Sequence, residues 1–283
     1  MIEASDYLTL DDPHVDYLLG SSDAEHERLI RQARRLAPVT ESFFREAGIG
    51  RGQRVLDVGS GVGDVAMLLS RLVGPSGAVV AVERDPRSIA RAKARAAEAR
   101  LYNVTFVLTD ITQFSSDASF DAAVGRFILQ FLPDPVGILR FLSDKVTSGG
   151  IIAFQECCWG PFALLSAHLP LWSTAVSLLH EVSARLGVNT EMGPALYRVF
   201  RDAGLPGPRM RLEMELGQDS DFTRWVSDVV TSVRPQIEKF NISCETLGDL
   251  DTLQQRLHEE VAASNTVVPW LAMVGAWCHK PMN

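Results

Sequence analysis

The chain has 283 residues, of which 46% are hydrophobic and 22% are charged, as expected for an ordinary globular protein with one large domain. Its 27 Lys and Arg and 35 Asp and Glu give a formal net charge of −8, and it has no basic run that would suit a nucleic acid or an anionic membrane. No apolar run approaches the roughly 20 residues needed to span a bilayer. Four cysteines without a CxxC pair indicate reduced thiols. Together with an N-terminal stretch unlike a signal peptide, they predict a cytoplasmic protein.

The first 156 residues predict one long helix followed by alternating strands and helices. Apolar residues recur at helical spacing over 22–47, and Ser22 and Glu25 form a capping-box pattern at its start. Strands are expected at 54–58, 78–83, 104–108, 120–125 and 150–156, with helices at about 64–73, 86–100 and 134–146. Apolar strands that alternate with helices predict a parallel sheet covered on both faces.

The pattern changes after Glu156. Residues 161–204 and 221–263 have helical patterns, whereas 209–216 and 270–281 are strand-like. We expect these two strands to pair as an antiparallel extension of the sheet. The helices are expected to form a lid over its carboxyl edge, where α/β proteins bind ligands.

Residues 54–69, RVLDVGSGVGDVAMLL, join a strand to a helix through a glycine-rich turn. Gly59, Gly61 and Gly63 occupy alternate positions, and glycine lets the backbone approach a ligand closely. Glu83 follows Gly63 by 20 residues and ends the second strand, where an acid can bind ribose hydroxyls. The turn therefore predicts a site for a nucleoside-containing ligand.

Two such ligands fit the turn, a dinucleotide and S-adenosylmethionine, which carries an ammonium, a carboxylate and a sulfonium instead of a pyrophosphate. The dinucleotide fingerprint G-x-G-x-x-G requires glycine at the position that Asp64 occupies here. Asp57, just before the turn, would repel a pyrophosphate but favour a nearby cation. S-adenosylmethionine is therefore the expected cofactor, and an NAD-dependent oxidoreductase is disfavoured.

The stretch VLDVGSGVGD (55–64) resembles motif I of the class I S-adenosylmethionine-dependent methyltransferases, D-x-G-x-G-x-G. The further stretches similar to this family are VAVERD (80–85), VLTDI (107–111), FDAAVGRFILQFLPDP (120–135) and GGIIAFQE (149–156). The resemblance covers about residues 50–156. It implies an α/β, Rossmann-like fold with a seven-stranded, mostly parallel sheet, helices on both faces and a helical lid inserted in the C-terminal half.

The resemblance also implies cofactor-binding roles for individual residues. These are Asp57, Gly59, Ser60 and Gly61 at the turn, Glu83 for the ribose hydroxyls, Arg84 beside the adenine, Asp110 for the adenine amino group, Ile111 for backbone and packing contacts, and Gly125 and Arg126 at the methionine end. Asp110 has an alternative role as the cap of a helix beginning at Ile111. The two roles are compatible, because a cap can also face a ligand.

The segment DYLLGSSDAEHERLIRQA (16–33) is similar to a bacterial subgroup of small-molecule methyltransferases, in which a leading helix packs over the cofactor pocket. Tyr17, Arg28 and Gln32 are candidates for contacts with the cofactor, and Arg28 and Gln32 share one helix face. For Arg28 a solvated polar face is an equal alternative. The expected division is a helical segment (1–50), a cofactor-binding core (51–156), and a lid with the last two strands (157–283).

Three residues are candidates for catalysis. Glu156 ends an apolar strand and should face the cleft, either as a general base or substrate anchor or in a structural hydrogen bond to a neighbouring loop. His168 and His180 lie in the predicted lid, where they could reach a substrate. His26 lies in a polar stretch and is expected to be exposed. No metal site is indicated.

The expected function is methyl transfer to a small, largely apolar molecule, with oxygen as the first choice of acceptor atom, carbon second and nitrogen third. The alternative is a protein that binds the cofactor without methylating, as a cyclase or a regulator. A small-molecule substrate is the expected partner, without nucleic acid or membrane, and the chain is expected to be a monomer or homodimer.

Overall fold

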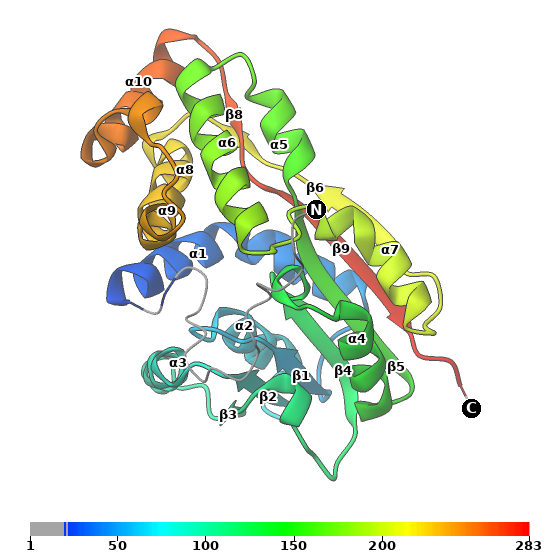
Figure 1. Ribbon diagram of the computed structural model, residues 1–283. Helices are drawn as coiled ribbons and strands as arrows, with labels where there is room; N and C mark the ends of the chain where they lie inside the picture. Colours follow the sequence, from blue (N-terminus) through cyan, green and yellow to red (C-terminus); the bar gives the residue numbers. More distant parts are fainter. Residues whose placement is uncertain (1–19, 21, 283) are drawn as a thin grey trace.

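The computed structural model describes residue 20 and residues 22–282, and its centre is a seven-stranded sheet (Figure 1). The strand order is β3-β2-β1-β4-β5-β9-β6, and β9 runs antiparallel to both of its neighbours, β5 and β6. The strands are β1 (Arg54–Val58), β2 (Ala78–Glu83), β3 (Val104–Leu108), β4 (Phe120–Arg126), β5 (Val146–Cys158), β6 (Arg209–Glu213) and β9 (Ala272–His279). The predicted α/β class and mostly parallel seven-stranded sheet are confirmed.

Helices cover both faces of this sheet because its central strands are apolar almost throughout and successive side chains point to opposite faces. Val55 and Val124 face one layer, formed by α1 (Asp23–Glu46), α2 (Asp64–Val73) and α3 (Pro86–Glu98). Leu56 and Ala123 face the other layer, formed by α4 (Pro135–Lys145) and α7 (Met192–Asp202). The short 3-10 helices η1 (Ile111–Gln113) and η2 (Leu129–Phe131) follow β3 and β4.

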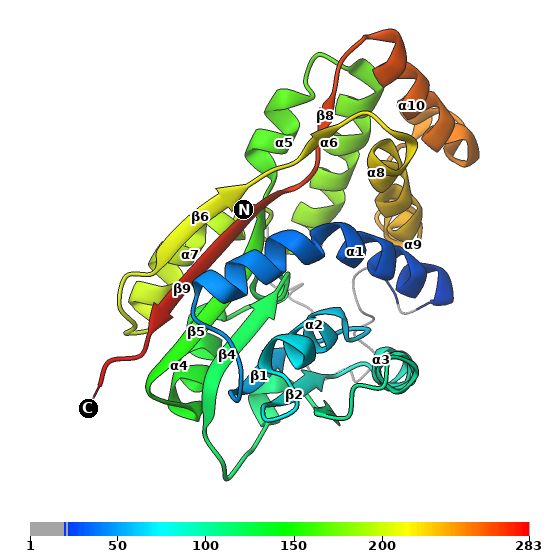
Figure 2. The same cartoon turned by 180° about the vertical axis from the view of Figure 1, so that it is seen from behind.

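The lid stands beyond the carboxyl ends of β4 and β5 and has an apolar core of its own (Figures 1 and 2). Its elements are α5 (Trp159–Leu165), α6 (Pro170–Arg185), α8 (Ser220–Ser232), α9 (Arg234–Lys239), η3 (Glu245–Leu247), η4 (Leu250–Thr252) and α10 (Leu253–Ala263), with the short strand pair β7 (Leu216–Gly217) and β8 (Val268–Pro269). Glu260 of α10 accepts hydrogen bonds from the backbone N–H groups of Leu171 and Trp172, and so caps the start of α6.

Two helical predictions differ from the structure. The helix at 192–202 packs on the sheet and not in the lid, because Met192, Leu196, Val199 and Phe200 form a stripe that contacts strand residues. The expected helical stretch 221–263 is divided into three α-helices and two short 3-10 helices. Pro235 lies in the first turn of α9, directly after α8, and Asn241, with φ +51°, follows the end of α9.

Candidate functional site

The glycine turn after β1 has the backbone conformation that its residues predict. Gly59, Gly61 and Gly63 have φ values of +68°, +51° and +87°, in the left-handed region that favours glycine. A Cβ atom on Gly59 would lie 2.6 Å from Cδ1 of Ile128, whereas one on Gly61 would meet no atom of the described residues within 4 Å. The N–H groups of Gly59 and Ser60 donate to the carbonyl of Val82, which fixes the turn against β2. Open space therefore lies beside Gly61, where a ligand can approach the backbone.

Asp57 is buried beneath this turn, with only 1% of its surface exposed. Its Oδ2 atom has no hydrogen-bond partner among the described residues. Burial raises the pKa of this carboxyl to about 7, although the nearby Arg126 guanidinium opposes the shift. A buried carboxylate oxygen without a donor is costly, and an N–H group or a cation from a ligand would supply what it lacks. The side chain present at this position thus fits the ammonium of S-adenosylmethionine.

Glu83 lies across the turn at the end of β2 and is 8% exposed. Its Oε2 accepts from the N–H of Gly61 at 2.9 Å, and its Oε1 accepts from the N–H groups of Arg84 and Asp85 at 2.8 and 2.9 Å. A carboxylate offers about four acceptor positions, so one remains for a ribose hydroxyl. Glu83 therefore connects the turn to β2 and can also bind a ligand.

The predicted adenine-side residues lie at the ends of β2 and β3. The side chain of Arg84 is exposed, whereas Ile111 is buried. Oδ1 of Asp110 accepts from the N–H and hydroxyl of Thr112, at 2.8 and 2.7 Å, so the helix-cap role of Asp110 is confirmed. Its role toward an adenine stays a prediction.

Arg126 ends β4 and reaches back to the long N-terminal helix. One of its terminal nitrogens donates to the hydroxyl of Thr40 at 3.0 Å, and that hydroxyl donates to Oε1 of Gln155 at 2.8 Å. Burial lowers the pKa of Arg126, whereas the neighbouring carboxylates Asp64 and Asp57 raise it. Gly125 pairs with Val58 across β1 and β4, which places Arg126 beside the glycine turn.

Gly125 has a clear packing role. A Cβ atom there would lie 2.6 Å from Cε1 of Phe154, so the close fit between β4 and β5 requires glycine. Its predicted contact with the cofactor remains a prediction.

Glu156 is fully buried near the end of β5. Its Oε1 accepts from the backbone N–H groups of Ile128 and Leu129, at 3.0 and 2.8 Å, whereas its Oε2 has no partner among the described residues. Burial raises the pKa of this carboxyl to about 7 against these hydrogen bonds, which lower it. The structural hydrogen bond to a neighbouring loop is present, and the second oxygen is available to hold a proton. The expectation that Glu156 faces the cleft is not met: its neighbour Cys157 lines the cavity at this edge of the sheet, and Glu156 does not.

Asp57 and Glu156 together predict how stability depends on pH. Because burial raises both pKa values to about 7, the folded chain keeps protons that the unfolded chain releases above its ordinary values of 3.8 and 4.5. Each group therefore lowers the free energy of unfolding progressively as the pH rises from about 4 to about 7. Urea unfolding of the cofactor-free protein should show Asp57→Asn to be stabilising at pH 8 but nearly neutral at pH 4.5. A difference independent of pH would contradict the raised pKa.

The structure separates the histidine candidates from one another. His168 is exposed on the turn between α5 and α6. His180 is half-buried, with its ring 4.8 Å from that of Trp159, and burial lowers its pKa.

Tyr17 lies outside the described residues. The expectation that His26 is exposed is wrong: it is 4% exposed, with Nε2 3.4 Å from the hydroxyl of Ser88.

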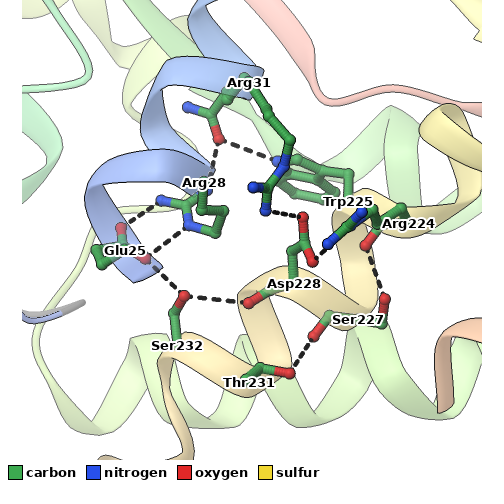
Figure 3. A network of polar contacts seen from close by, with 10 residues as sticks. Glu25, Arg28, Arg31, Arg224, Trp225, Ser227, Asp228, Thr231 and Ser232 are labelled. Atoms are coloured by element: carbon green, nitrogen blue, oxygen red, sulfur yellow. Dashed lines mark hydrogen bonds and ion pairs between the residues drawn. The ribbon is translucent and has the colours of Figure 1, made fainter. Parts of the chain in front are cut away.

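The solvated alternative for Arg28 is also wrong, because α8 covers this part of α1. Arg28 is 4% exposed and donates to both oxygens of Glu25, from Nε at 2.8 Å and from NH2 at 2.6 Å. Its NH1 donates to Oε1 of Gln32 at 2.8 Å, and Nε1 of Trp225 donates to the same oxygen at 3.1 Å. Figure 3 shows this network, in which Ser232 also donates to Glu25 at 2.6 Å.

A cavity of about 100 Å³ lies between the N-terminal helix, the lid and the carboxyl ends of β4 and β5. Its lining residues are Arg28, Leu29 and Gln32 of α1; Phe127, Gln130 and Phe131 after β4; Cys157 and Trp159 around the end of β5; Leu179, Val182, Ser183, Leu186 and Val188 of α6 and the turn after it; and Trp225, Val229, Val233 and Leu271. Most of these side chains are apolar, as is typical of small-molecule sites. We call this space the lid cavity.

Sequence reasoning did not identify the residues after β4 as cavity residues. Phe127 has φ +56°, a conformation that costs a residue with a side chain roughly 1–2 kcal/mol, and its N–H donates to the carbonyl of Gln155. Strain of this kind is concentrated at functional sites. Gln130 accepts a hydrogen bond from Sγ of Cys157 at 2.8 Å. The sequence feature that could have identified these residues is their position directly after β4, because this strand ends beside the predicted cofactor site.

The described residues include no cluster of three or more His, Cys, Asp and Glu side chains that could hold a metal ion. None of the helices among them has the length and apolarity needed to cross a membrane.

Comparison with known proteins agrees with this geometry. A family model described as "Methyltransferase domain" matches residues 49–204, more than half of the chain. Aklanonic acid methyltransferase DauC of Streptomyces sp. (strain C5) is 36% identical over 106 residues, which are 37% of this chain and 48% of that protein. The match thus spans about half the length of this curated relative.

The solved structures are similar in fold at low sequence identity. The YcgJ protein from Bacillus subtilis has a TM-score of 0.56 at 14% identity, covering 88% of this chain and 100% of that chain. The [4+2]-cyclase SpnF has a TM-score of 0.50 at 17% identity, covering 87% and 82%. With the family match over residues 49–204 and the left-handed glycine turn above Asp57, the chain belongs to the class I S-adenosylmethionine-dependent methyltransferase family.

Proposed function

We propose that this protein transfers the methyl group of S-adenosylmethionine to a small, largely apolar molecule bound in the lid cavity. The observation that carries the proposal is the buried Oδ2 of Asp57, which has no partner among the described residues and lies beneath a turn where those residues leave space beside Gly61. These features suit a positively charged ligand held against backbone atoms. The apolar lid cavity at the same edge of the sheet supplies a place for the acceptor.

S-adenosylmethionine supplies, when bound, a methyl group on a sulfonium that a nucleophile can displace directly. Asp57 would hold the ammonium and Glu83 the ribose hydroxyls. Arg84, Asp110 and Ile111 would lie at the adenine end of the site. The further proposed contacts are Gly59, Ser60, Gly61 and Arg126 around the methionine portion, with Gln32 and Tyr17 as candidates from the N-terminal segment.

The lid and the N-terminal helix position the acceptor and exclude water. Leu179, Val182 and Trp225 place apolar walls on the lid side of the cavity. Alignment of the reacting atoms and exclusion of water can lower the barrier by several kcal/mol without a covalent catalyst. The protein's main contribution to the proposed reaction is therefore positioning.

Oxygen is the first choice of acceptor atom, carbon the second and nitrogen the third. Glu156 is our candidate for removing a proton from the acceptor, because its buried Oε2 has no partner among the described residues and its pKa of about 7 suits a base. His180 is the alternative within the lid, since it packs beside the cavity residue Trp159. His168 is a weaker candidate because it is exposed. None of these three residues is among those that line the lid cavity.

Release of S-adenosylhomocysteine is the direct test of this function. Purified protein would be incubated with S-adenosylmethionine and a panel of apolar phenols, ketones and carboxylic acids, with boiled protein as the control. We expect at least one acceptor to give release well above the acceptor-free rate. The name of the relative DauC, an aklanonic acid methyltransferase, supports including polycyclic acids in the panel.

Cofactor binding without methyl transfer is the alternative function, and the fold likeness to the cyclase SpnF makes it worth testing. Binding of S-adenosylmethionine without any release across the panel would favour that role. The family match supports methylation as the first choice.

A further inference from the structure

The lid cavity has one charged side chain among the described residues that line it, Arg28, and that charge is already neutralised. Arg28 forms an ion pair with Glu25 in which both side chains are at most 5% exposed. Glu25 in turn accepts from two nitrogens of Arg28 and from the hydroxyl of Ser232. An anion entering the cavity would find no free positive charge, and a cation would find no free carboxylate.

Other polar groups of the cavity are neutral. Burial raises the pKa of the Cys157 thiol well above its ordinary value, so this group is uncharged at neutral pH. A buried charge is costly unless it is paired, so a charged acceptor would lose its hydration without compensation here. The cavity therefore favours an uncharged molecule.

Two amide side chains, Gln32 and Gln130, place hydrogen-bonding groups in the wall of the cavity. Oε1 of Gln32 accepts from Arg28 and Trp225, and Oε1 of Gln130 accepts from Cys157. No described residue accepts a hydrogen bond from the amide nitrogen of either side chain. The amide N–H groups of Gln32 and Gln130 can therefore donate to a bound molecule, whereas the oxygen of Gln32 already accepts two hydrogen bonds and that of Gln130 accepts one.

From these contacts we infer that the lid cavity selects an uncharged, apolar molecule that carries a hydrogen-bond-accepting oxygen, such as an aromatic ketone or quinone. This inference rests on the proposed function and specifies its acceptor. Gln130 donates to the oxygen of this molecule, and Glu25 maintains the selection against anions by neutralising Arg28. An ammonium group meets no carboxylate among the described lining residues and is disfavoured.

Three naphthalene probes of nearly equal size test the charge selection: 2-acetylnaphthalene, 2-naphthoate and 2-naphthylmethylammonium. Calorimetric titration at pH 7.5, with and without S-adenosylhomocysteine, gives the dissociation constant of each. We expect the ketone to bind at least about tenfold more tightly than either ion. Preference for an ion, or no binding of any probe, would overturn the inference.

Substitutions in the Arg28–Glu25 ion pair test whether this pair causes the selection against anions. Glu25→Gln leaves the Arg28 charge uncompensated, and we expect the affinity for 2-naphthoate to rise about tenfold. The matched control is Glu27→Gln, on the same helix as Glu25, which removes an exposed carboxylate paired with Arg91 of α3 and should leave the order of the probes unchanged. The double variant Glu25→Gln/Arg28→Met should restore the preference for the ketone, so misfolding of one variant cannot imitate the result. An unchanged naphthoate affinity in Glu25→Gln would overturn the role of this pair.

Replacement of Gln130 tests the hydrogen bond. Gln130→Leu should weaken 2-acetylnaphthalene about tenfold and leave unsubstituted naphthalene unchanged or slightly tighter. Equal weakening of both probes would overturn the hydrogen-bonding role. Because these probes are titrated without a methyl donor, failure of the cavity inference is distinguishable from failure of the proposed function, which is measured by S-adenosylhomocysteine release.

Discussion

Asp57→Asn should weaken binding of S-adenosylmethionine at least about 100-fold, which corresponds to about 2.7 kcal/mol. The carboxylate is 1% exposed, and its Oδ2 has no partner in the described residues, so a ligand cation would provide its main compensation. A buried charge-assisted hydrogen bond of this kind contributes about 1.5–3 kcal/mol. Asparagine preserves the shape of the side chain and removes its charge. Calorimetric titration of the two proteins measures the loss.

Asp64→Asn is the matched control for this prediction. Asp64 also adjoins the glycine turn, but its Oδ1 is engaged by Arg95 at 2.6 Å. Its replacement should lower stability modestly and change cofactor affinity much less than Asp57→Asn does. Equal losses of affinity in the two variants would mean that the turn responds to any change of charge, and the specific role of Asp57 would be wrong.

Glu156→Gln should lower the rate of methyl transfer about 100-fold or more if Glu156 removes a proton from the acceptor, since general bases contribute 10²–10⁴-fold. Glutamine can keep the Oε1 contacts with Ile128 and Leu129, so the fold and the affinity for S-adenosylmethionine should change little. In the wild type, a base with a pKa of about 7 makes the rate rise as the pH increases from 6 to 8. That rise should be absent in the variant.

Full turnover in Glu156→Gln would leave this residue with its structural hydrogen bonds alone. His180→Gln tests the alternative in which His180 of the lid, instead of Glu156, removes the proton. A loss of turnover confined to that variant would transfer the role to His180, which is half-buried beside Trp159.

Local sequence signals predict most of the sheet and the glycine turn. The apolar strand over residues 54–58 and the alternating glycines are constrained by contacts within one strand–turn–helix unit, and both are observed. Such features need no information about distant parts of the chain.

The lid cavity could not be predicted in the same way, because its walls come from elements far apart in the sequence. The pattern of α1 shows a polar face at Arg28 but does not show that Trp225 of α8 covers it. Nor does the sequence show that the stripe beginning at Met192 turns toward the sheet. The choice of acceptor depends on these long-range contacts, so the sequence indicates the cofactor more clearly than the acceptor.

Titration of the wild-type chain with S-adenosylmethionine, in parallel with NADH, is the most direct test of the central claim. We expect one molecule of S-adenosylmethionine to bind per chain, with heat that disappears when S-adenosylhomocysteine is already present, and no binding of NADH. Absence of S-adenosylmethionine binding, or tighter binding of NADH, would contradict the assignment of Asp57 and the glycine turn as the cofactor site.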